Sequence, residues 1–359
     1  MNMIERLHLH RLSLPLTTPY KLAFGPVVAF DTIIARVWDA DGREGFGEAT
    51  ILTGYTPETI DSAWRIAGEL AAAMLGAEFE PAKATALAAH TAAPFTATAL
   101  ATAVEMLEGS PLLQTPGASV PLLAIINATD PAGIEQEIEA RIAEGYETLK
   151  IKVGFDLETD LQRVAFIQSR LGDRARIRLD GNQGYSRDDG VHFAAALDPD
   201  GIELLEQPCH MDDWQAAEAA AKVATVPMML DESIYGADEI KRAADLKAAR
   251  YIKLKLMKAG SLADLAEQLE LIGDLDMIPV LGNGVASDPG CWMEACIAHR
   301  YINNAGEMNG FLKPTGGLFV DPITVTGGTM VLPVTPPILD QAAILRHQTA
   351  TAVFPESYG

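Results

Sequence analysis

Residues 148–154 read TLKIKVG, a short apolar run that carries two lysines, and four later segments follow the same plan. They are RIRLDGNQGY at 176–185, GIELLEQP at 201–208, PMMLDES at 227–233 and YIKLKLMKAG at 251–260. Each places a charged residue between an apolar run and a helical stretch, which is the repeat of a (β/α)8 barrel. Strand C-terminal ends meet at one pocket in that fold. We therefore expect these side chains to converge: Lys152, Asp180, Glu206, Asp231 and Lys255.

The composition fits a folded globular protein and argues against some classes of partner. A chain of 359 residues suits a barrel with an accessory domain, and 48% hydrophobic residues allow a large core. The formal net charge of -22 argues against nucleic acid or an anionic membrane as a partner. Three cysteines without CxxC spacing predict a reducing compartment, and no 18-residue apolar run or signal-peptide core is seen. We expect a cytoplasmic homo-oligomer.

The pattern of polar and apolar residues changes twice along the chain. Residues 2–16 and 32–42 alternate as half-buried strands do, and 57–115 has helical periods, so we predict an α+β capping domain over 1–115. Strands and helices alternate over 116–315, which predicts an α/β fold with a modified (β/α)8 barrel. Residues 316–359 contain a strand-like run and are expected to return to the capping domain. Strands two to eight of the barrel are predicted to end near Lys152, Asp180, Glu206, Asp231, Lys255, Asn283 and Glu307.

Three of the converging residues are carboxylates on neighbouring strands. Asp180, Glu206 and Asp231 end strands three, four and five, so their oxygens can surround one cation. Mg2+ prefers such oxygen ligands and keeps open positions for substrate and water, with Mn2+ as a substitute. Any one of the three, taken alone, fits a helix N-cap or an exposed charge equally well. Asn182 and Glu232, beside two of them, are predicted supporting residues.

Two lysines are predicted to move protons. Strands two and six are opposite in a ring of eight, so Lys152 and Lys255 should face each other across a bound substrate. Lys150 lies two residues before Lys152 and shares its side of the strand. A neighbouring ammonium and a metal ion make Lys152 easier to deprotonate, as a base near neutral pH requires. Lys253 has the same relation to Lys255, and surface lysines are the alternative interpretation.

Four further residues are predicted to contact the substrate. Tyr55 and Thr56 lie in a loop before a helix, where a lid is expected. Asn283 and Glu307 follow strands seven and eight, and Glu307 could meet a substrate ammonium. Packing or turn roles remain open for all four.

These motifs resemble the enolase superfamily, specifically its muconate-lactonizing-enzyme-like subgroup. The resemblance rests on Lys-Ile-Lys at 150–152, Asp-Glu-Ser at 231–233, Lys-Leu-Met-Lys-Ala-Gly at 255–260 and Gly-Phe-Gly-Glu-Ala at 45–49. It implies a capping domain, a modified barrel, an essential Mg2+ and abstraction of the proton α to a substrate carboxylate. Lys253 departs from the family pattern, which often has Asn there.

A weaker resemblance links segments 52–56, 282–288, 291–296 and 307–313 to the cis-3-hydroxy-L-proline dehydratases of this subgroup. It implies that one lysine takes the α-proton and the other protonates the departing hydroxyl. Racemisation or epimerisation of an N-acyl amino acid or dipeptide is the alternative, and cycloisomerisation a third. Dipeptide epimerases carry Asp-x-Asp on strand eight, where this chain has Glu-Met-Asn. A non-catalytic relative would have lost the lysines or the carboxylates.

Overall fold

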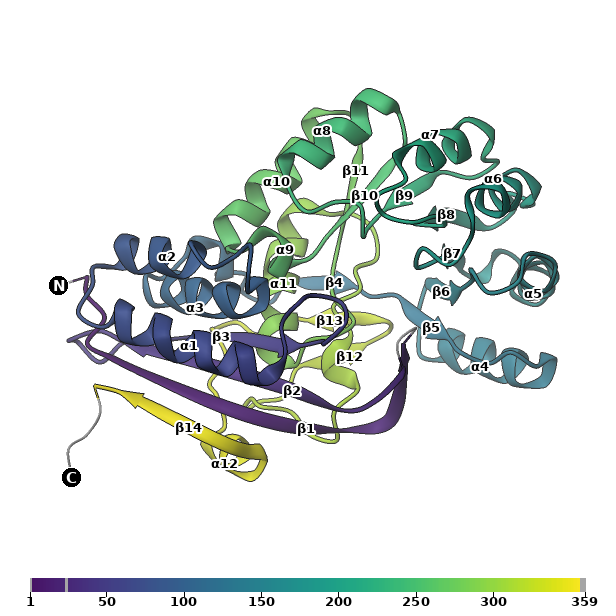
Figure 1. The fold of residues 1–359 in the computed structure, drawn as a ribbon. Coiled ribbons are helices and arrows are strands. Elements are labelled where there is room, and N and C mark those ends of the chain that lie inside the picture. Colours follow the sequence, from purple (N-terminus) through teal and green to yellow (C-terminus); the bar gives the residue numbers. More distant parts are fainter. Residues whose placement is uncertain (1, 23–24, 356–359) are drawn as a thin grey trace.

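The computed structural model of the chain describes residues 2–22 and 25–355. Its N-terminal part is a four-stranded antiparallel sheet with helices on one face (Figure 1). The sheet order is β14-β1-β2-β3, formed by β1 (Arg6–Leu22), β2 (Gly25–Trp38), β3 (Glu44–Ile51) and β14 (Gln348–Phe354). A hairpin turn at Asp41–Gly42 joins β2 to β3, and Gly42 supplies the positive φ of 78° that the turn needs.

Three helices, α1 (Ile60–Met74), α2 (Phe79–Leu87) and α3 (Pro94–Leu107), accompany this sheet. Helix α1 begins at Ile60, three residues after the start of the helical period predicted over 57–115. Thr59 is its N-cap, in a reciprocal capping box with Ser62. The carboxylate of Glu58 instead accepts hydrogen bonds from the backbone of Phe95 and Thr96 at the start of α3. Glu58 therefore fixes the loop before α1 against a neighbouring helix.

The second part is a parallel sheet that curves into a barrel, with helices outside it (Figure 1). The strand order is β11-β10-β9-β8-β7-β6-β5. The strands are β5 (Ala124–Ile126), β6 (Thr148–Lys152), β7 (Arg176–Asp180), β8 (Ile202–Glu206), β9 (Met228–Leu230), β10 (Tyr251–Leu254) and β11 (Ile278–Leu281). The connecting helices are α4 (Pro131–Ala143), α5 (Leu157–Leu171), α6 (Arg187–Ala196), α7 (Trp214–Val223), α8 (Ala237–Leu246), α9 (Leu256–Ala259), α10 (Leu262–Asp274) and α11 (Asp288–Tyr301). The predicted fold class, an α/β barrel with a capping domain, is confirmed.

The eighth barrel position differs from the prediction, because no regular strand is assigned near Glu307 within the described residues. The backbone there still closes the ring. Glu307 N donates to Leu281 O at 3.1 Å on one side, and Leu123 N donates to Gly306 O at 3.0 Å on the other. Gly306 forms only an isolated bridge with Leu122, so an extended segment replaces a strand.

The C-terminal segment divides between the two parts. Strands β12 (Thr324–Thr326) and β13 (Thr329–Val331) pair with each other, and β13 also pairs with β4 (Ser119–Pro121). Helix α12 (Gln341–His347) and β14 then lie beside β1 in the capping sheet (Figure 1). Short 3-10 turns occur at Pro111–Leu113, Gly172–Arg174 and Gly310–Leu312. Among the described residues, no helix is long and apolar enough to cross a membrane. The three cysteines are free and buried.

The contact between β3 and α3 requires glycine at 47. A Cβ atom on Gly47 would lie 2.0 Å from Ala99 O and 2.6 Å from Thr102 Oγ1, which no side chain tolerates. We expect Gly47→Val to lower the free energy of unfolding by roughly 1–3 kcal/mol or more, because the helix must move off the sheet. Urea denaturation measures this. The control is Gly68→Ala, where a Cβ meets nothing within 4 Å. Equal stability of the two variants would contradict the contact.

Candidate active site

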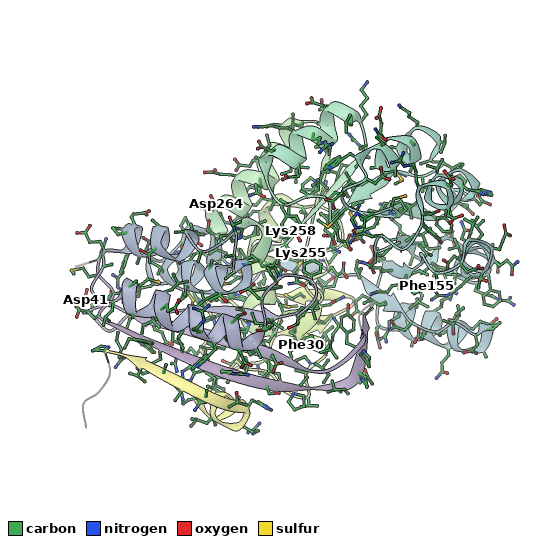
Figure 2. The ribbon with its side chains drawn as sticks, viewed as in Figure 1. Phe30, Asp41, Phe155, Lys255, Lys258 and Asp264 are labelled. Carbon is green, nitrogen blue, oxygen red and sulfur yellow. The ribbon has the colours of Figure 1, made fainter. Side chains whose placement is uncertain are left out.

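A cavity of about 300 Å³ lies at the C-terminal ends of the barrel strands and is covered by the capping domain. Its principal lining residues are Tyr20, Tyr55, Phe95, Lys150, Lys152, Asp180, Asn182, Asp231, Glu232, Lys253, Lys255, Asn283, Gly284 and Glu307. Lys152 ends β6 and Lys255 follows β10, two strands that are four apart in the sheet order. The two lysines therefore reach one cavity from well-separated strands. Figure 2 labels Lys255 and Lys258 where the capping helices approach the barrel.

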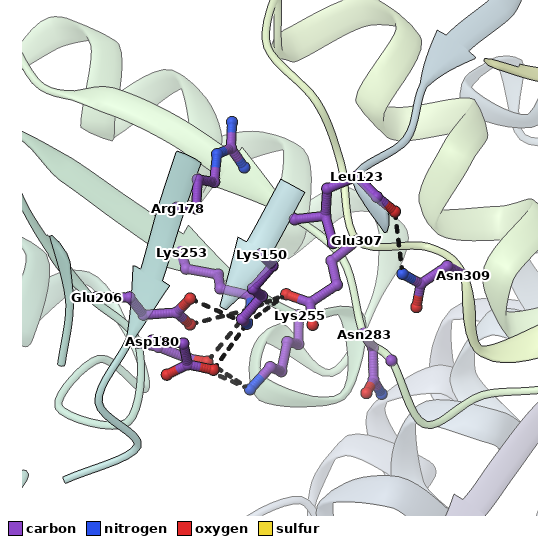
Figure 3. A network of polar contacts seen from close by, with 12 residues as sticks. Leu123, Lys150, Arg178, Asp180, Glu206, Lys253, Lys255, Asn283, Glu307 and Asn309 are labelled. Carbon is purple, nitrogen blue, oxygen red and sulfur yellow. Dashed lines mark hydrogen bonds and ion pairs between the residues drawn. The ribbon is translucent and has the colours of Figure 1, made fainter. Parts of the chain in front are cut away.

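The floor of the site is a network of buried charges (Figure 3). Lys150 Nζ lies 2.8 Å from Asp180 Oδ2, 3.0 Å from Glu206 Oε2 and 2.9 Å from Glu307 Oε2. Burial alone would lower the pKa of Lys150, but these three carboxylates outweigh burial and raise it well above its ordinary value. Lys150 is thus a fixed positive charge that joins β6 to β7, β8 and the eighth position.

Lys253 forms the second connection within this network. Its Nζ lies 3.0 Å from Glu206 Oε1 and 3.6 Å from Asp231 Oδ2, and it also donates to Glu307 Oε2. Burial and repulsion by Asp180 raise the pKa of Glu206 to about 7, despite the nearby lysines. For Glu307, burial is outweighed by Lys150 and Lys253, which hold the pKa of that carboxyl well below its usual range.

The two predicted proton carriers differ in their surroundings. Lys255 Nζ donates to Asp231 Oδ2 at 2.8 Å and to the Tyr55 hydroxyl at 2.7 Å, and it lies 4.7 Å from the centre of the Tyr55 ring. Burial is outweighed mainly by Asp231, so the pKa of Lys255 is well above its ordinary value. Lys152 Nζ has no hydrogen bond or ion pair with any described side chain, and it lies 5.8 Å from the centre of the Tyr20 ring. Lys152 is therefore the less restrained of the two.

The three predicted metal ligands lie close together, and their carboxylate oxygens form ion pairs with lysines. Asp180, Glu206 and Asp231 are buried at the ends of β7, β8 and β9. Within residues 2–22 and 25–355, no three His, Cys, Asp or Glu side chains are grouped closely enough to hold a metal ion as they stand. The donor set nevertheless fits a hard divalent cation, because every donor is a carboxylate oxygen.

Glu232 is a buried carboxylate beside the predicted metal ligands, and its negative charge is not compensated. Its Oε2 is buried and has no hydrogen-bond partner among the described residues, while Oε1 accepts from Asn182 Nδ2 at 3.2 Å. Burial and the nearby Asp231 and Asp180 raise the pKa of Glu232. An additional cation at this place would satisfy the orphaned oxygen, so the residues fit Mg2+.

Two predicted site residues do not line the cavity. Glu206 lies beneath it, held by Lys150 and Lys253. The Thr56 hydroxyl instead makes a long hydrogen bond of 3.5 Å to Glu58 Oε2. Asn283 does line the cavity, but its Oδ1 accepts from the backbone of Val285, as a turn residue does.

Four residues near the site were not predicted. Tyr20 comes from the long β1–β2 hairpin and lies half-buried in the cavity wall, where desolvation of its hydroxyl and the charge of Glu307 raise its pKa to about 12. Lys258 Nζ donates to Asp231 Oδ1 at 2.8 Å. Its position three residues after Lys255, on the same turn of α9, was the available signal. Lys313 and Glu294 are the other two.

Glu294 is a buried carboxyl on α11 behind Lys255. Its Oε1 accepts from Leu256 N at 2.8 Å, whereas Oε2 has no partner among the described residues. Burial raises the pKa of Glu294 to about 7. A small adjacent cavity of about 30 Å³ touches Glu294 and Asn283.

Comparison with known proteins identifies the family of the chain. The profile of the family described as "Enolase C-terminal domain-like" matches residues 133–336, more than half of the chain. The L-Ala-D/L-Glu epimerase of Bacillus subtilis is 31% identical over 288 residues, covering 76% of this chain and 78% of the epimerase. The N-succinyl-L-Arg/Lys racemase of Bacillus cereus is 26% identical over 338 residues, covering 89% and 91%.

Solved structures agree on the fold. The dipeptide epimerase from Cytophaga hutchinsonii, solved with Mg and the dipeptide D-Ala-L-Val, superposes with a TM-score of 0.89 at 20% identity, covering 98% of this chain and 99% of that chain. The N-succinyl Arg/Lys racemase from Bacillus cereus gives 0.88 at 22% identity, with 98% and 99% covered.

The raised pKa of Glu294 predicts a pH-dependent stability. The folded protein holds this proton up to about pH 7, whereas an ordinary glutamate loses it near 4.5. The contribution of Glu294 to the free energy of unfolding is therefore fully present below about pH 4.5 and is lost as the pH rises to about 7. We expect Glu294→Gln to be more stable than the parent by roughly 1–3 kcal/mol at pH 8 and close to it at pH 4.5. Urea denaturation at both pH values measures this, and a constant difference would contradict the assignment.

Proposed function

Because the chain belongs to the enolase superfamily, in its muconate-lactonizing-enzyme-like group, we propose that it racemises or epimerises an amino-acid derivative at the carbon next to a carboxylate. The observation that carries this proposal is the pair Lys152 and Lys255. They reach one cavity from strands four apart, as a proton exchange on two faces of one carbon requires. The relatives named above are an epimerase and a racemase of such compounds, which favours this isomerase reaction over dehydration.

The different surroundings of the two lysines assign one as the base and the other as the acid in one direction of the reaction. Lys152 makes no ion pair with a described carboxylate, and in this direction its Nζ is the base that takes the α-proton as the Cα–H bond breaks. Lys255 is kept charged by Asp231 and hydrogen-bonded to Tyr55, so it donates a proton to the opposite face of the same carbon. The roles exchange in the reverse direction, and the net change is inversion at Cα.

Three carboxylates would hold the metal, namely Asp180, Glu206 and Asp231. As is established for the enolase superfamily, bound Mg2+ supplies positive charge that stabilises an enediolate, and Mn2+ is the expected substitute. The lysine network remains beneath it: Lys150 and Lys253 offset part of the charge of the floor carboxylates, which favours a carboxylate substrate that gains a second negative charge. Tyr55, Phe95 and Tyr20 close the cavity and limit water.

Dehydration of cis-3-hydroxy-L-proline is the second candidate. The segments that carry that resemblance, 282–288 and 307–313, contribute Asn283, Gly284 and Glu307 to the cavity wall. The same first step applies, since one lysine removes the α-proton. The other lysine would then protonate the β-hydroxyl as the C–O bond breaks, giving water and an enamine.

A deuterium-exchange panel with lysine variants tests the proposal. In D2O with Mg2+, N-acyl amino acids, dipeptides and cis-3-hydroxy-L-proline are followed by NMR. We expect inversion with α-deuteration of an amino-acid derivative, and loss of inversion by several orders of magnitude in Lys152→Ala and Lys255→Ala. Each variant should retain exchange from one enantiomer only. Formation of a cyclic imine from hydroxyproline, without inversion of any compound, would replace isomerisation by dehydration.

Metal removal should abolish the reaction. We expect EDTA to stop turnover and Mg2+ or Mn2+ to restore it, because the carboxylates would otherwise repel the enediolate. Asp231→Asn should weaken metal affinity by roughly ten- to a hundredfold while the protein remains folded. Calorimetric titration with Mg2+ measures the affinity, and Asp213→Asn, at the N-cap of α7, is the control. Full turnover of metal-free protein would refute the metal requirement.

A further inference from the structure

Glu294 is a buried carboxyl group that takes no part in the proton transfers described above. It lies on α11, only 2% of its surface is exposed, and its Oε2 has no hydrogen-bond partner among the described residues. Its Oε1 accepts from Leu256 N at 2.8 Å, a hydrogen bond that we call the Leu256 anchor. Leu256 follows Lys255 directly in the chain. The anchor therefore joins α11 to the segment that carries one of the two proton carriers.

The peptide group between Lys255 and Leu256 is held at both ends. Its carbonyl oxygen, Lys255 O, accepts from Lys258 N at 3.0 Å in the single turn of α9. Its N–H receives no acceptor from that turn, because Lys255 is the N-cap residue and its side chain makes no capping hydrogen bond. Glu294 Oε1 supplies the acceptor instead. A peptide group is planar and includes the Cα atoms on both sides, so fixing this group also fixes the Cα atom of Lys255.

The peptide group before Lys255 is held separately, by the parallel sheet. Leu254 O accepts from Gly282 N at 3.2 Å, just after β11. Lys255 has an extended backbone between the two fixed peptide groups, with φ of −136° and ψ of 144°. The direction of its Cα–Cβ bond, and therefore the path of its side chain into the cavity, follows from both contacts. The first contact belongs to the barrel backbone, whereas the second depends on one side chain, that of Glu294.

The charged end of the Lys255 side chain cannot replace this backbone contact during the reaction. Nζ donates to Asp231 and to the Tyr55 hydroxyl, but a lysine that gives and takes a proton must direct one N–H to the substrate. The backbone contacts can stay unchanged through such a cycle. Proton transfer requires hydrogen-bond distance between the reacting atoms, and a displacement of about 1 Å can cost roughly a hundredfold in rate. The backbone position of Lys255 therefore bears directly on that rate.

The anchor does not require a charged carboxylate. Burial raises the pKa of Glu294 to about 7, so below this pH the group is a neutral carboxyl that still offers Oε1 as an acceptor. Glu294→Gln should consequently preserve the contact with Leu256 N. Glu294 is also held in place from the capping domain, because Glu48 on β3 accepts from Ser287 N and Gly290 N at the start of α11.

We propose that Glu294 is a positioning residue for Lys255: by accepting from Leu256 N, it fixes the backbone that directs Lys255 to one face of the substrate's α-carbon. This role rests on the proposed function, because it assigns Glu294 to one of the two proton transfers. Lys152 comes from β6, in a different part of the sheet. Glu294 should therefore matter for the face that Lys255 serves and not for the face that Lys152 serves, which a general structural role would not produce.

Variants at position 294 in two lysine backgrounds test this role. Lys152→Ala leaves Lys255 as the proton carrier, and Lys255→Ala leaves Lys152, so each background exchanges one enantiomer of the amino-acid derivative that the parent inverts fastest in D2O. Glu294→Met removes the acceptor at nearly constant size, and Glu294→Gln keeps it. Glu105→Met is the matched control, since Glu105 is also a buried carboxyl that accepts from two backbone N–H groups, at the start of α10. Melting temperatures establish that each variant is folded.

We expect Glu294→Met to slow exchange roughly ten- to a hundredfold in the Lys152→Ala background and less than about twofold in the Lys255→Ala background. The loss should lie in kcat rather than KM, because Leu256 N binds no substrate. Glu294→Gln should restore exchange in the Lys152→Ala background, and Glu105→Met should affect both backgrounds equally. No loss with Glu294→Met, equal losses in the two backgrounds, or equal losses with Glu294→Met and Glu294→Gln would overturn the positioning role.

Amide hydrogen exchange separates this role from the proposed function, because it needs no substrate. Measured by mass spectrometry, Glu294→Met should increase deuterium uptake in residues 251–260, and Glu105→Met should increase it at the start of α10 instead. Increased uptake in 251–260, together with no exchange of any compound by the parent protein, would support the Leu256 anchor and refute the isomerase. Unchanged uptake in 251–260 would overturn the anchor, even where the parent protein inverts an amino-acid derivative.

Discussion

The structure depends on the compensation of buried charge at the mouth of the barrel. The carboxylates at the ends of β7, β8 and β9 are buried, where water does not screen their charges, and they would repel one another. Lys150 and Lys253 lie between them and compensate this charge. Both lysines also bind Glu307, which belongs to the part of the ring that lacks a regular strand. The barrel is thus closed at its eighth position by two backbone hydrogen bonds and by this ion network together. Removing one member would leave another buried charge without a partner, a costly change in a low-dielectric interior.

The capping domain completes the same site from above. Tyr55, in the loop fixed by Glu58, accepts a hydrogen bond from Lys255, and Tyr20 comes from the far end of the β1–β2 hairpin. Glu48 on β3 accepts from Ser287 and Gly290 at the start of α11, which joins the two parts of the chain behind the cavity. The position of Lys255 is consequently determined by both domains, and the surface that recognises the substrate is shared between them.

Much of this architecture could be predicted from the sequence, because a buried parallel strand followed by a charged residue is a local pattern. It located the ends of β6 to β10 and assigned the family correctly. The prediction of a regular eighth strand was wrong. Glu307 has the expected spacing, but the backbone around Gly306 forms only an isolated bridge and a few hydrogen bonds to the neighbouring strands. Thr56 illustrates a further limit: its loop was found, but its hydroxyl turns to Glu58. Tyr20 and Glu294 were not predicted because the groups they contact are far away in sequence, and a local sequence pattern does not show such contacts.

The central claim is that two lysines act on opposite faces of one α-carbon. The most direct measurement starts from a single enantiomer of the substrate in D2O and determines deuterium at Cα, early in the reaction, in the product and in the unreacted substrate. Two separate proton carriers predict that the inverted product is almost fully deuterated from its first appearance, because its new hydrogen comes from a different lysine. Transfer of the original protium from substrate to inverted product would show that one group serves both faces, and would contradict this account.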